Sequence, residues 1–403
     1  RAQRDLGDTR MSTRQHPEDA PPTAGCASAD PRYAAYRGCA YHPAPSTAAD
    51  AGLTQAEKPS AEDPANGGEY RVFLRYDTRI APDVSGPVKL SVTDVEYLQD
   101  LHRQGNEALG REALGVKSTD HFMLRGAGLR FTPHILGGDV RGPDTTGADE
   151  SIELSLHVPV STIRRRRGQP CYAISGAITL WAGDTCLAES DGAALFLTAD
   201  TFEELRGELG NITEIQDAAS AGGASAEPPK AVRVWGTPYG HVQAAPASLC
   251  GVSDASQVLI GDVRHNDTAH GTETAQEQVE EPREKTSERL SQNPPGTSAL
   301  AQCRIVPTAP PRHFDRPLDH YPGLMMASAA RQFAVAALAH RIGADPANLR
   351  VAEESHEFFE FVELTEIPTL NLLRREKHRD TYQTEITVNQ GGAVKARSRF
   401  TFM

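Results

Sequence analysis

An internal repeat limits the possible folds of this chain more than any other feature of its sequence. Residues 97–115 align without a gap on residues 325–343, at a spacing of 228 residues. At that spacing Arg103-Gln104 meets Arg331-Gln332, and both segments end in glycine. Several coincidences at one spacing indicate a duplicated structural unit. The chain is therefore expected to fold as two like units.

Each matched segment predicts a helix that ends at a glycine, Gly115 in one and Gly343 in the other, because glycine readily adopts the left-handed conformation that closes a helix. The second helix, 324–338, is apolar on almost every side, so other structure has to enclose it. Arg331 near its centre and its short length argue against a membrane span.

Strand-like runs separated by short turns follow both helices. They lie at 121–132, 151–160, 172–182 and 185–197 in the first unit and at 349–364, 369–374, 382–389 and 393–402 in the second. One enclosed helix followed by an antiparallel meander, present twice, predicts an α+β fold in which a curved sheet wraps around a helix.

The polar part of the chain is concentrated in three segments. Only 38% of the 403 residues are hydrophobic, which is low for a chain of this length that is packed throughout. Residues 1–68 predict a disordered tail, 265–299 a disordered insertion, and 211–230 a linker. Two ordered units remain, 69–210 and 231–403.

The charge and the cysteines exclude several classes of protein. A net charge of −13 argues against general binding to nucleic acid or to an anionic membrane. The six cysteines include no C-x-x-C pair, which argues against a zinc knuckle or a redox pair, and they are too few for a disulfide scaffold. The first residues contain no apolar signal segment. A reduced, cytoplasmic location is the expectation.

The segment 314–332, FDRPLDHYPGLMMASAARQ, resembles the signature of the A-factor biosynthesis hotdog family, the AfsA-like proteins. In that family the second repeat typically reads FDHPLDHVPGM, followed by a helix of the EAARQ type. The first unit resembles the family's first repeat through Asp100, which precedes Arg103-Gln104, and through the HFMLR stretch at 121–125. The resemblance covers both ordered units.

The resemblance implies a tandem, pseudo-dimeric hotdog fold, with a long central helix in a curved antiparallel sheet in each unit. It also implies an acyltransferase that moves a β-ketoacyl group from acyl-carrier protein or coenzyme A to the hydroxyl of dihydroxyacetone phosphate. That reaction is the committed step towards γ-butyrolactone-type signals, which control antibiotic production in filamentous actinobacteria. No redox cofactor or metal is implied.

The start of the second helix is the candidate catalytic site. Pro322 suits a first helical position, and Gly323 lets a substrate approach the backbone closely. The free N–H groups and the positive end of the helix dipole there would polarise a thioester carbonyl. His320 is the candidate base for the attacking hydroxyl, because histidine titrates near neutral pH, and a structural histidine is the alternative. Asp319 either orients His320 or caps the helix.

The sequence departs from the family pattern at two positions. Ser328 stands where the family's helix carries Glu; it can bind a substrate by a hydrogen bond but cannot act as a general base near neutral pH. Its counterpart Asp100 is the remaining candidate acid, expected to face His320 across the interface of the units. Arg316 stands where the family carries a histidine and suits a phosphate, with a solvated arginine as the alternative. We expect at most one productive site.

Arg103 and Arg331 are predicted to be buried in mid-helix, where an arginine requires a partner. The partner is either a carboxylate or backbone carbonyl of the protein, or the phosphate of the substrate. Gln104 and Gln332 are predicted to tie their helices to the sheet, and Gln332 is a further candidate for binding substrate.

Two dense basic clusters, 164–167 and 374–379, stand out in an acidic chain. They predict either solvated hairpin turns or a docking surface for the acidic carrier protein and its phosphopantetheine phosphate. Two other classes of function stay open. One is a catalytically degenerate hotdog protein that binds acyl chains or a partner, which the loss of Glu at Ser328 favours. The other is a thioesterase or dehydratase of the same fold.

Overall fold

A computed structural model of the chain describes residues 69–77, 92–117, 119–133, 151–165, 170–182, 184–207, 242–266, 299–306, 320–364 and 366–403. The predicted tail, the predicted linker and residues 267–298 of the predicted insertion lie outside the described residues.

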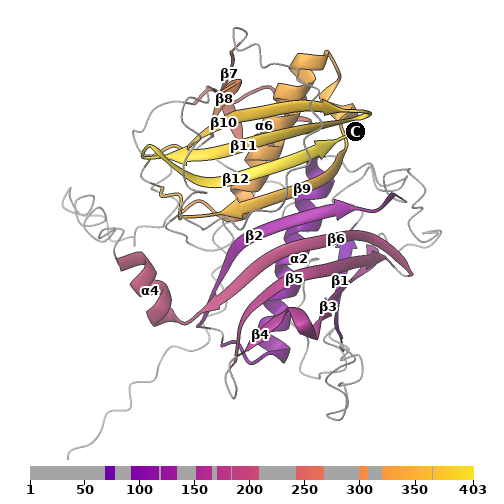
Figure 1. Cartoon of the computed structure of the whole chain (residues 1–403), viewed down its shortest axis with the longest axis vertical. Helices are drawn as coiled ribbons and strands as arrows, with labels where there is room; N and C mark the ends of the chain where they lie inside the picture. The colour runs from indigo at the N-terminus through magenta and orange to yellow at the C-terminus, as the bar shows by residue number, and fades with distance from the viewer. Residues whose placement is uncertain are drawn as a thin grey trace, which may run out of the picture.

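Each unit contains one long helix and a set of strands (Figure 1). The first unit comprises β1 Glu69–Asp77, α2 Val92–Ala113, β2 His121–Phe131, β3 Ser151–Pro159, β4 Ile163–Arg165, β5 Cys171–Ala182, β6 Thr185–Leu197 and α4 Ala199–Gly207. The second comprises β7 Ile260–His265, β8 Ala301–Ile305, α6 Gly323–Ile342, β9 Val351–Phe358, β10 Thr369–His378, β11 Thr381–Gln390 and β12 Ala393–Phe402. Single 3-10 turns lie at Val160–Thr162, Ala247–Cys250, Ala255–Gln257 and Pro346–Asn348.

The described strands form one continuous antiparallel sheet. Its order is β1-β3-β5-β6-β2-β9-β12-β11-β10-β8-β7, and β4 pairs with β5 beside this path. At the centre, β2 pairs with β9 from Gly126↔Glu357 to Arg130↔Glu353. In both units the strand that follows the long helix, β2 or β9, lies at this junction, and the last strand of the unit, β6 or β12, lies next to it. The remaining strands follow outwards in both units, as β5, β3 and β1 in the first and as β11, β10 and β8 in the second. The topology is therefore that of two like units side by side, with β7 as an additional edge strand.

The two long helices lie on the same side of the sheet (Figure 1) and differ in burial. Every residue of α6 from Leu324 to Ala339 is buried, as its apolar sequence requires. The helix ends at Gly343, whose φ of 66° is the predicted left-handed conformation. In contrast, α2 buries residues such as Leu101 and Leu109 and carries a line of charged residues on another face.

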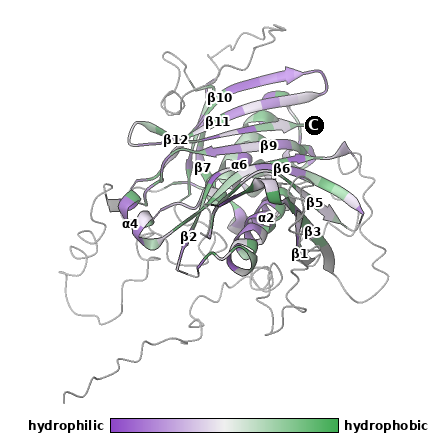
Figure 2. Cartoon of the chain, turned by 60° about the horizontal axis from the view of Figure 1, so that its bottom comes forward, coloured by the Kyte–Doolittle hydropathy of each residue, from purple (hydrophilic) through white to green (hydrophobic). Residues whose placement is uncertain are grey.

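The predicted α+β fold, a helix with an antiparallel sheet, is confirmed, and one basic cluster is placed differently from the prediction. The strand β10 continues to His378, four residues beyond the predicted end at 374. The turn follows at Arg379, where φ is 55°. Residues 374–378 occupy consecutive positions of a strand that Figure 2 shows as largely hydrophilic, so they belong to the strand and not to the turn.

Candidate functional site

His320 lies where the chain enters α6. Its backbone forms an isolated antiparallel bridge with Glu363, and the next residue, Tyr321, donates its N–H to the Val362 carbonyl at 2.8 Å. The half-buried imidazole meets the ring of Phe361 edge-on, with centroids 4.8 Å apart. The segment that follows β9 therefore holds both the backbone and the ring of His320.

The helix begins one residue later than the sequence predicts. Pro322, with φ −61° and ψ 141°, is the N-cap, and Gly323 is the first helical residue. The reason is the bridge at His320, which keeps the chain extended up to Pro322. A Cβ atom at Gly323 would lie 3.3 Å from the Phe358 ring, so the helix start fits tightly against β9. The N–H groups of this first turn have no partner within the helix and point towards its N-terminal end.

A short helix of the first unit, α4, packs against the segment that holds His320. Arg206 of α4 binds Glu363 through two hydrogen bonds, Nη1 to Oε1 at 2.7 Å and Nη2 to Oε2 at 3.0 Å. The same guanidinium lies 4.6 Å from the centroid of the Phe361 ring. Phe202 of α4 meets Phe361 edge-on at 5.9 Å, and His121 of β2 stacks on Phe202 at 4.0 Å. Side chains of the first unit therefore pack against Phe361 and Glu363, the two residues that contact His320.

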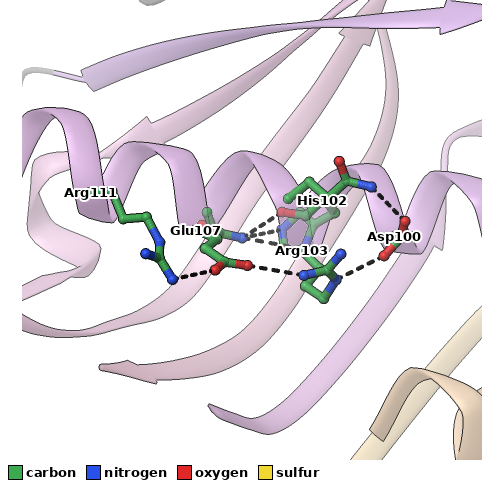
Figure 3. Close-up of polar contacts among 7 residues, drawn as sticks. Asp100, His102, Arg103, Glu107 and Arg111 are labelled. Atoms are coloured by element: carbon green, nitrogen blue, oxygen red, sulfur yellow. Dashed lines mark hydrogen bonds and ion pairs between the residues drawn. The ribbon is translucent and has the colours of Figure 1, made fainter. Parts of the chain in front are cut away.

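Asp100 lies on the charged face of α2, shown in Figure 3. Its carboxylate accepts hydrogen bonds from Arg103 Nε at 2.8 Å and from Gln104 Nε2 at 2.6 Å. Arg103 also binds Glu107 at 3.0 Å, and Glu107 binds Arg111 at 2.7 Å. Spacings of three and four residues place these groups on one helix face. Arg103 thus has carboxylate partners, and Gln104 binds within its own helix, so the prediction that Gln104 ties α2 to the sheet is wrong.

The expectation that Asp100 faces His320 stays a prediction. Gln99, the neighbour of Asp100, accepts a hydrogen bond from Arg331, so α2 meets α6 at the level of these two residues.

Arg331 is fully buried at the junction of the two units. It binds Glu354 of β9 twice, Nε to Oε2 at 2.7 Å and Nη2 to Oε1 at 2.9 Å, and Nη2 also donates to Gln99 Oε1 of α2 at 3.0 Å. Burial alone would raise the pKa of Glu354, but the Arg331 charge and the nearby His356 outweigh it and lower the pKa to about 2. The carboxylate is therefore ionised and supplies the protein partner that a buried Arg331 requires.

The remaining predicted residues fall into three groups. Gln332 accepts a hydrogen bond from the Leu259 N–H and donates to the Gln257 carbonyl, both at 2.8 Å. It thereby ties α6 to the segment that leads into β7. Ser328 is fully buried, and its Oγ has no hydrogen-bond partner among the described residues. Asp319 and Arg316 lie outside the described residues.

Within the described part of the chain, no helix is long and apolar enough to cross a membrane.

Comparison with solved structures finds likenesses at low sequence identity. A putative thioesterase from Novosphingobium aromaticivorans has 12% identity and a TM-score of 0.35, covering 83% of this chain and 94% of that chain. The acyl-CoA thioesterase II TesB2 from Mycobacterium marinum has 11% identity and a TM-score of 0.34, covering 82% and 90%. A 12:0-ACP thioesterase from Umbellularia californica has 8% identity and a TM-score of 0.35, covering 83% and 97%. At these values the likeness says nothing about substrate or reaction. No curated protein matches the sequence.

A family model matches the C-terminal part of the chain. The model is described as the A-factor biosynthesis hotdog domain, and it matches residues 293–403. This range contains β8, α6 and the strands β9 to β12, together with His320 and Gly323. It also contains the segment 314–332 on which the resemblance to this family rests. Residues 293–403 of the second unit therefore match the A-factor biosynthesis hotdog domain.

Proposed function

We propose that this protein is a hotdog-fold enzyme for acyl thioesters. In its specific form, the proposal is an acyltransferase that moves a β-ketoacyl group from acyl-carrier protein or coenzyme A to the hydroxyl of dihydroxyacetone phosphate. The product is a precursor of a γ-butyrolactone-type signal. The observation that carries the proposal is the match of residues 293–403 to the A-factor biosynthesis hotdog domain.

The geometry at the start of α6 suits the chemical step. A thioester carbonyl placed at Gly323 would accept hydrogen bonds from the first N–H groups of the helix. One such donor contributes about 3–4 kcal/mol to the stabilisation of an oxyanion. As the hydroxyl oxygen of the acceptor bonds to the carbonyl carbon, His320 takes its proton. The carbon–sulfur bond then breaks, and His320 returns the proton to the departing thiolate.

A basic surface on the second unit suits the carrier. Arg375 and Lys377 of β10 are exposed or half-buried strand residues, and Arg374 beside them pairs with Glu376 at 2.5 Å. In the first unit, the exposed Arg164 and Arg165 belong to β4. An acidic carrier approaching a chain of net charge −13 needs a local positive surface of this kind.

Ser328 favours a second candidate function. The side chain is fully buried at a helix position where the resemblance implies Glu, and a serine supplies no carboxylate for acid–base chemistry. A protein that binds acyl thioesters without transferring the acyl group is the corresponding alternative, and a thioesterase is the third.

One assay separates the three functions. The protein is incubated with a 3-oxoacyl-carrier thioester and dihydroxyacetone phosphate, and the products are identified by mass spectrometry. A phosphorylated β-ketoacyl ester, or the butenolide formed from it, supports the transferase. Release of free thiol and acid without ester supports a thioesterase, and an unchanged thioester supports a binding protein.

A further inference from the structure

A group of buried polar side chains occupies the junction between the two units. It consists of Gln99 from α2, Arg331 from α6, Glu354 and His356 from β9, and Ser398 from β12, each at most 2% exposed. The His356 Nδ1 lies 2.8 Å from Ser398 Oγ, and its Nε2 lies 3.6 Å from Glu354 Oε1. Buried polar groups of this kind are costly unless each atom has a partner.

Two neighbouring donors in this group lack a partner. Arg331 Nη1 and Gln99 Nε2 are buried, and neither has a hydrogen-bond partner among the described residues. They lie close together, because Arg331 Nη2 donates to Gln99 Oε1 at 3.0 Å. Arg331 Nη1 is bonded to the same carbon as Nη2, and Gln99 Nε2 is bonded to the same carbon as Oε1. Both donors therefore lie at the same junction without an acceptor among the described residues, and a ligand oxygen that reaches them would satisfy them.

The charges around these donors select the kind of oxygen. Arg331 is already neutralised by the ionised Glu354, which contacts it through two hydrogen bonds. A phosphate beside this pair would place its negative charges close to the Glu354 carboxylate, and like charges repel strongly in a buried site. An uncharged acceptor, such as a carbonyl oxygen, pays no such penalty. The arrangement therefore favours a keto oxygen over the phosphate contact that the sequence left open for Arg331.

We infer that Arg331 Nη1 and Gln99 Nε2 form the binding site for the 3-oxo group of an acyl thioester. The inference rests on the proposed function for the class of substrate. It adds the two residues, one from each unit, that distinguish a 3-oxoacyl chain from a saturated one.

Binding measured without dihydroxyacetone phosphate tests the inference apart from the transfer reaction. Isothermal titration compares 3-oxooctanoyl-CoA with octanoyl-CoA. The wild-type protein should bind the 3-oxo ligand about tenfold more tightly or better, as a hydrogen bond to a charged donor allows. Gln99→Met keeps the length of the side chain and removes its donor, so most of this preference should disappear while the affinity for octanoyl-CoA stays unchanged.

A matched control lies on the same helix. Gln104→Met removes an amide that is bonded to Asp100 and does not contact Arg331, so the preference for the 3-oxo ligand should survive. Equal affinity of the wild-type protein for the two ligands, no binding of either, or a preference that survives Gln99→Met would each overturn the inference. A clear preference without any transfer product would sustain it while contradicting the transferase.

A second measurement needs only the wild-type protein and is independent of how the variants fold. With 13C at the keto carbon of 3-oxooctanoyl-CoA, the carbonyl resonance should move downfield on binding, because two N–H donors, one of them charged, polarise the carbonyl. A resonance that stays at its position in water would contradict the assigned contact.

Discussion

Arg206 Nη1 and Glu363 Oε1 lie 2.7 Å apart, and this ion pair links the first unit to the segment that holds His320. The Arg206 side chain is 10% exposed and that of Glu363 21%. Arg206 also covers the face of Phe361, the ring that contacts His320. Through these two contacts α4 fixes both the backbone and the aromatic neighbour of the candidate base.

Arg206→Met should therefore destabilise the fold and reduce activity. The loss of a charged, doubly hydrogen-bonded contact is expected to cost about 1.5–3 kcal/mol of unfolding free energy, measured by urea denaturation. Arg130→Met is the control, because Arg130 pairs with Glu353 at the surface and is 66% exposed. Its loss should cost less than about 1 kcal/mol. Equal effects of the two substitutions would show that the α4 contact does not contribute more than a surface pair.

Substitution within the buried pair of Arg331 and Glu354 should destabilise the fold much more than substitution of Arg206 or Arg130. Arg331→Met leaves an ionised carboxylate in the core, which is expected to cost about 3–5 kcal/mol. The double variant Arg331→Met, Glu354→Gln removes both charges and should regain a large part of that loss, because the uncompensated charge causes most of it. Denaturation of the single and double variants measures this coupling, and additive effects would contradict it.

The same pair predicts acid sensitivity. The pKa of Glu354 is about 2 in the folded chain against an ordinary value of 4.5. A carboxyl with a lowered pKa contributes stability above its unfolded pKa and loses it as the pH falls. The contribution, on the order of 3 kcal/mol, should decline between pH 4.5 and 2. The double variant Arg331→Met, Glu354→Gln should lack this part of the pH dependence that the wild-type chain shows.

His102 should make the folding stability depend on pH in a higher range than Glu354 does. Burial lowers its pKa from 6.5 to about 4, so the unfolded chain binds a proton in this range that the folded chain does not. Stability should therefore be complete above pH 6.5 and fall as the pH decreases towards 4. His102→Gln should flatten the stability profile over this range. A profile that His102→Gln does not alter would rule out His102 as its source.

His320→Ala tests the candidate base. Loss of a general base is expected to lower the rate of acyl transfer about 10²–10⁴-fold, with little change in stability because the ring is only half-buried. His340→Ala, at the other end of α6, is the control and should retain the full rate. Full activity of His320→Ala would remove this histidine from the mechanism.

Some elements of the second unit could be predicted from the sequence almost to their boundaries, because periodicity and turns agree there, whereas the predicted strand 349–364 is shorter in the structure and ends at Phe358. The predicted strand 393–402 is β12 itself, and the predicted helix falls within α6. The short strands β7 and β8 were not predicted, since they flank a long polar segment and are too short to show a clear alternation. The helix α4 also escaped prediction, because nine residues with mixed charges carry little signal.

The partners of the candidate residues could be predicted only in part. Glu354 and Phe358 lie on the same face of β9, because side chains of a strand alternate between its two faces. The sequence alternation therefore indicates a buried carboxylate that can be the partner of Arg331. The contacts of Arg331 with Gln99, and of Arg206 with Glu363, join residues 232 and 157 positions apart. No local pattern specifies such pairs, because they depend on how the two units meet at β2 and β9.

The most direct test of the proposed function is the product of the complete reaction. The wild-type protein is supplied with a 3-oxoacyl-carrier thioester labelled with 13C in the acyl chain, together with dihydroxyacetone phosphate, and the mixture is analysed by mass spectrometry. The account predicts a labelled phosphorylated ester or butenolide that is absent without dihydroxyacetone phosphate and strongly reduced in His320→Ala. Labelled free acid with no ester, or thioester that persists unchanged, would contradict it.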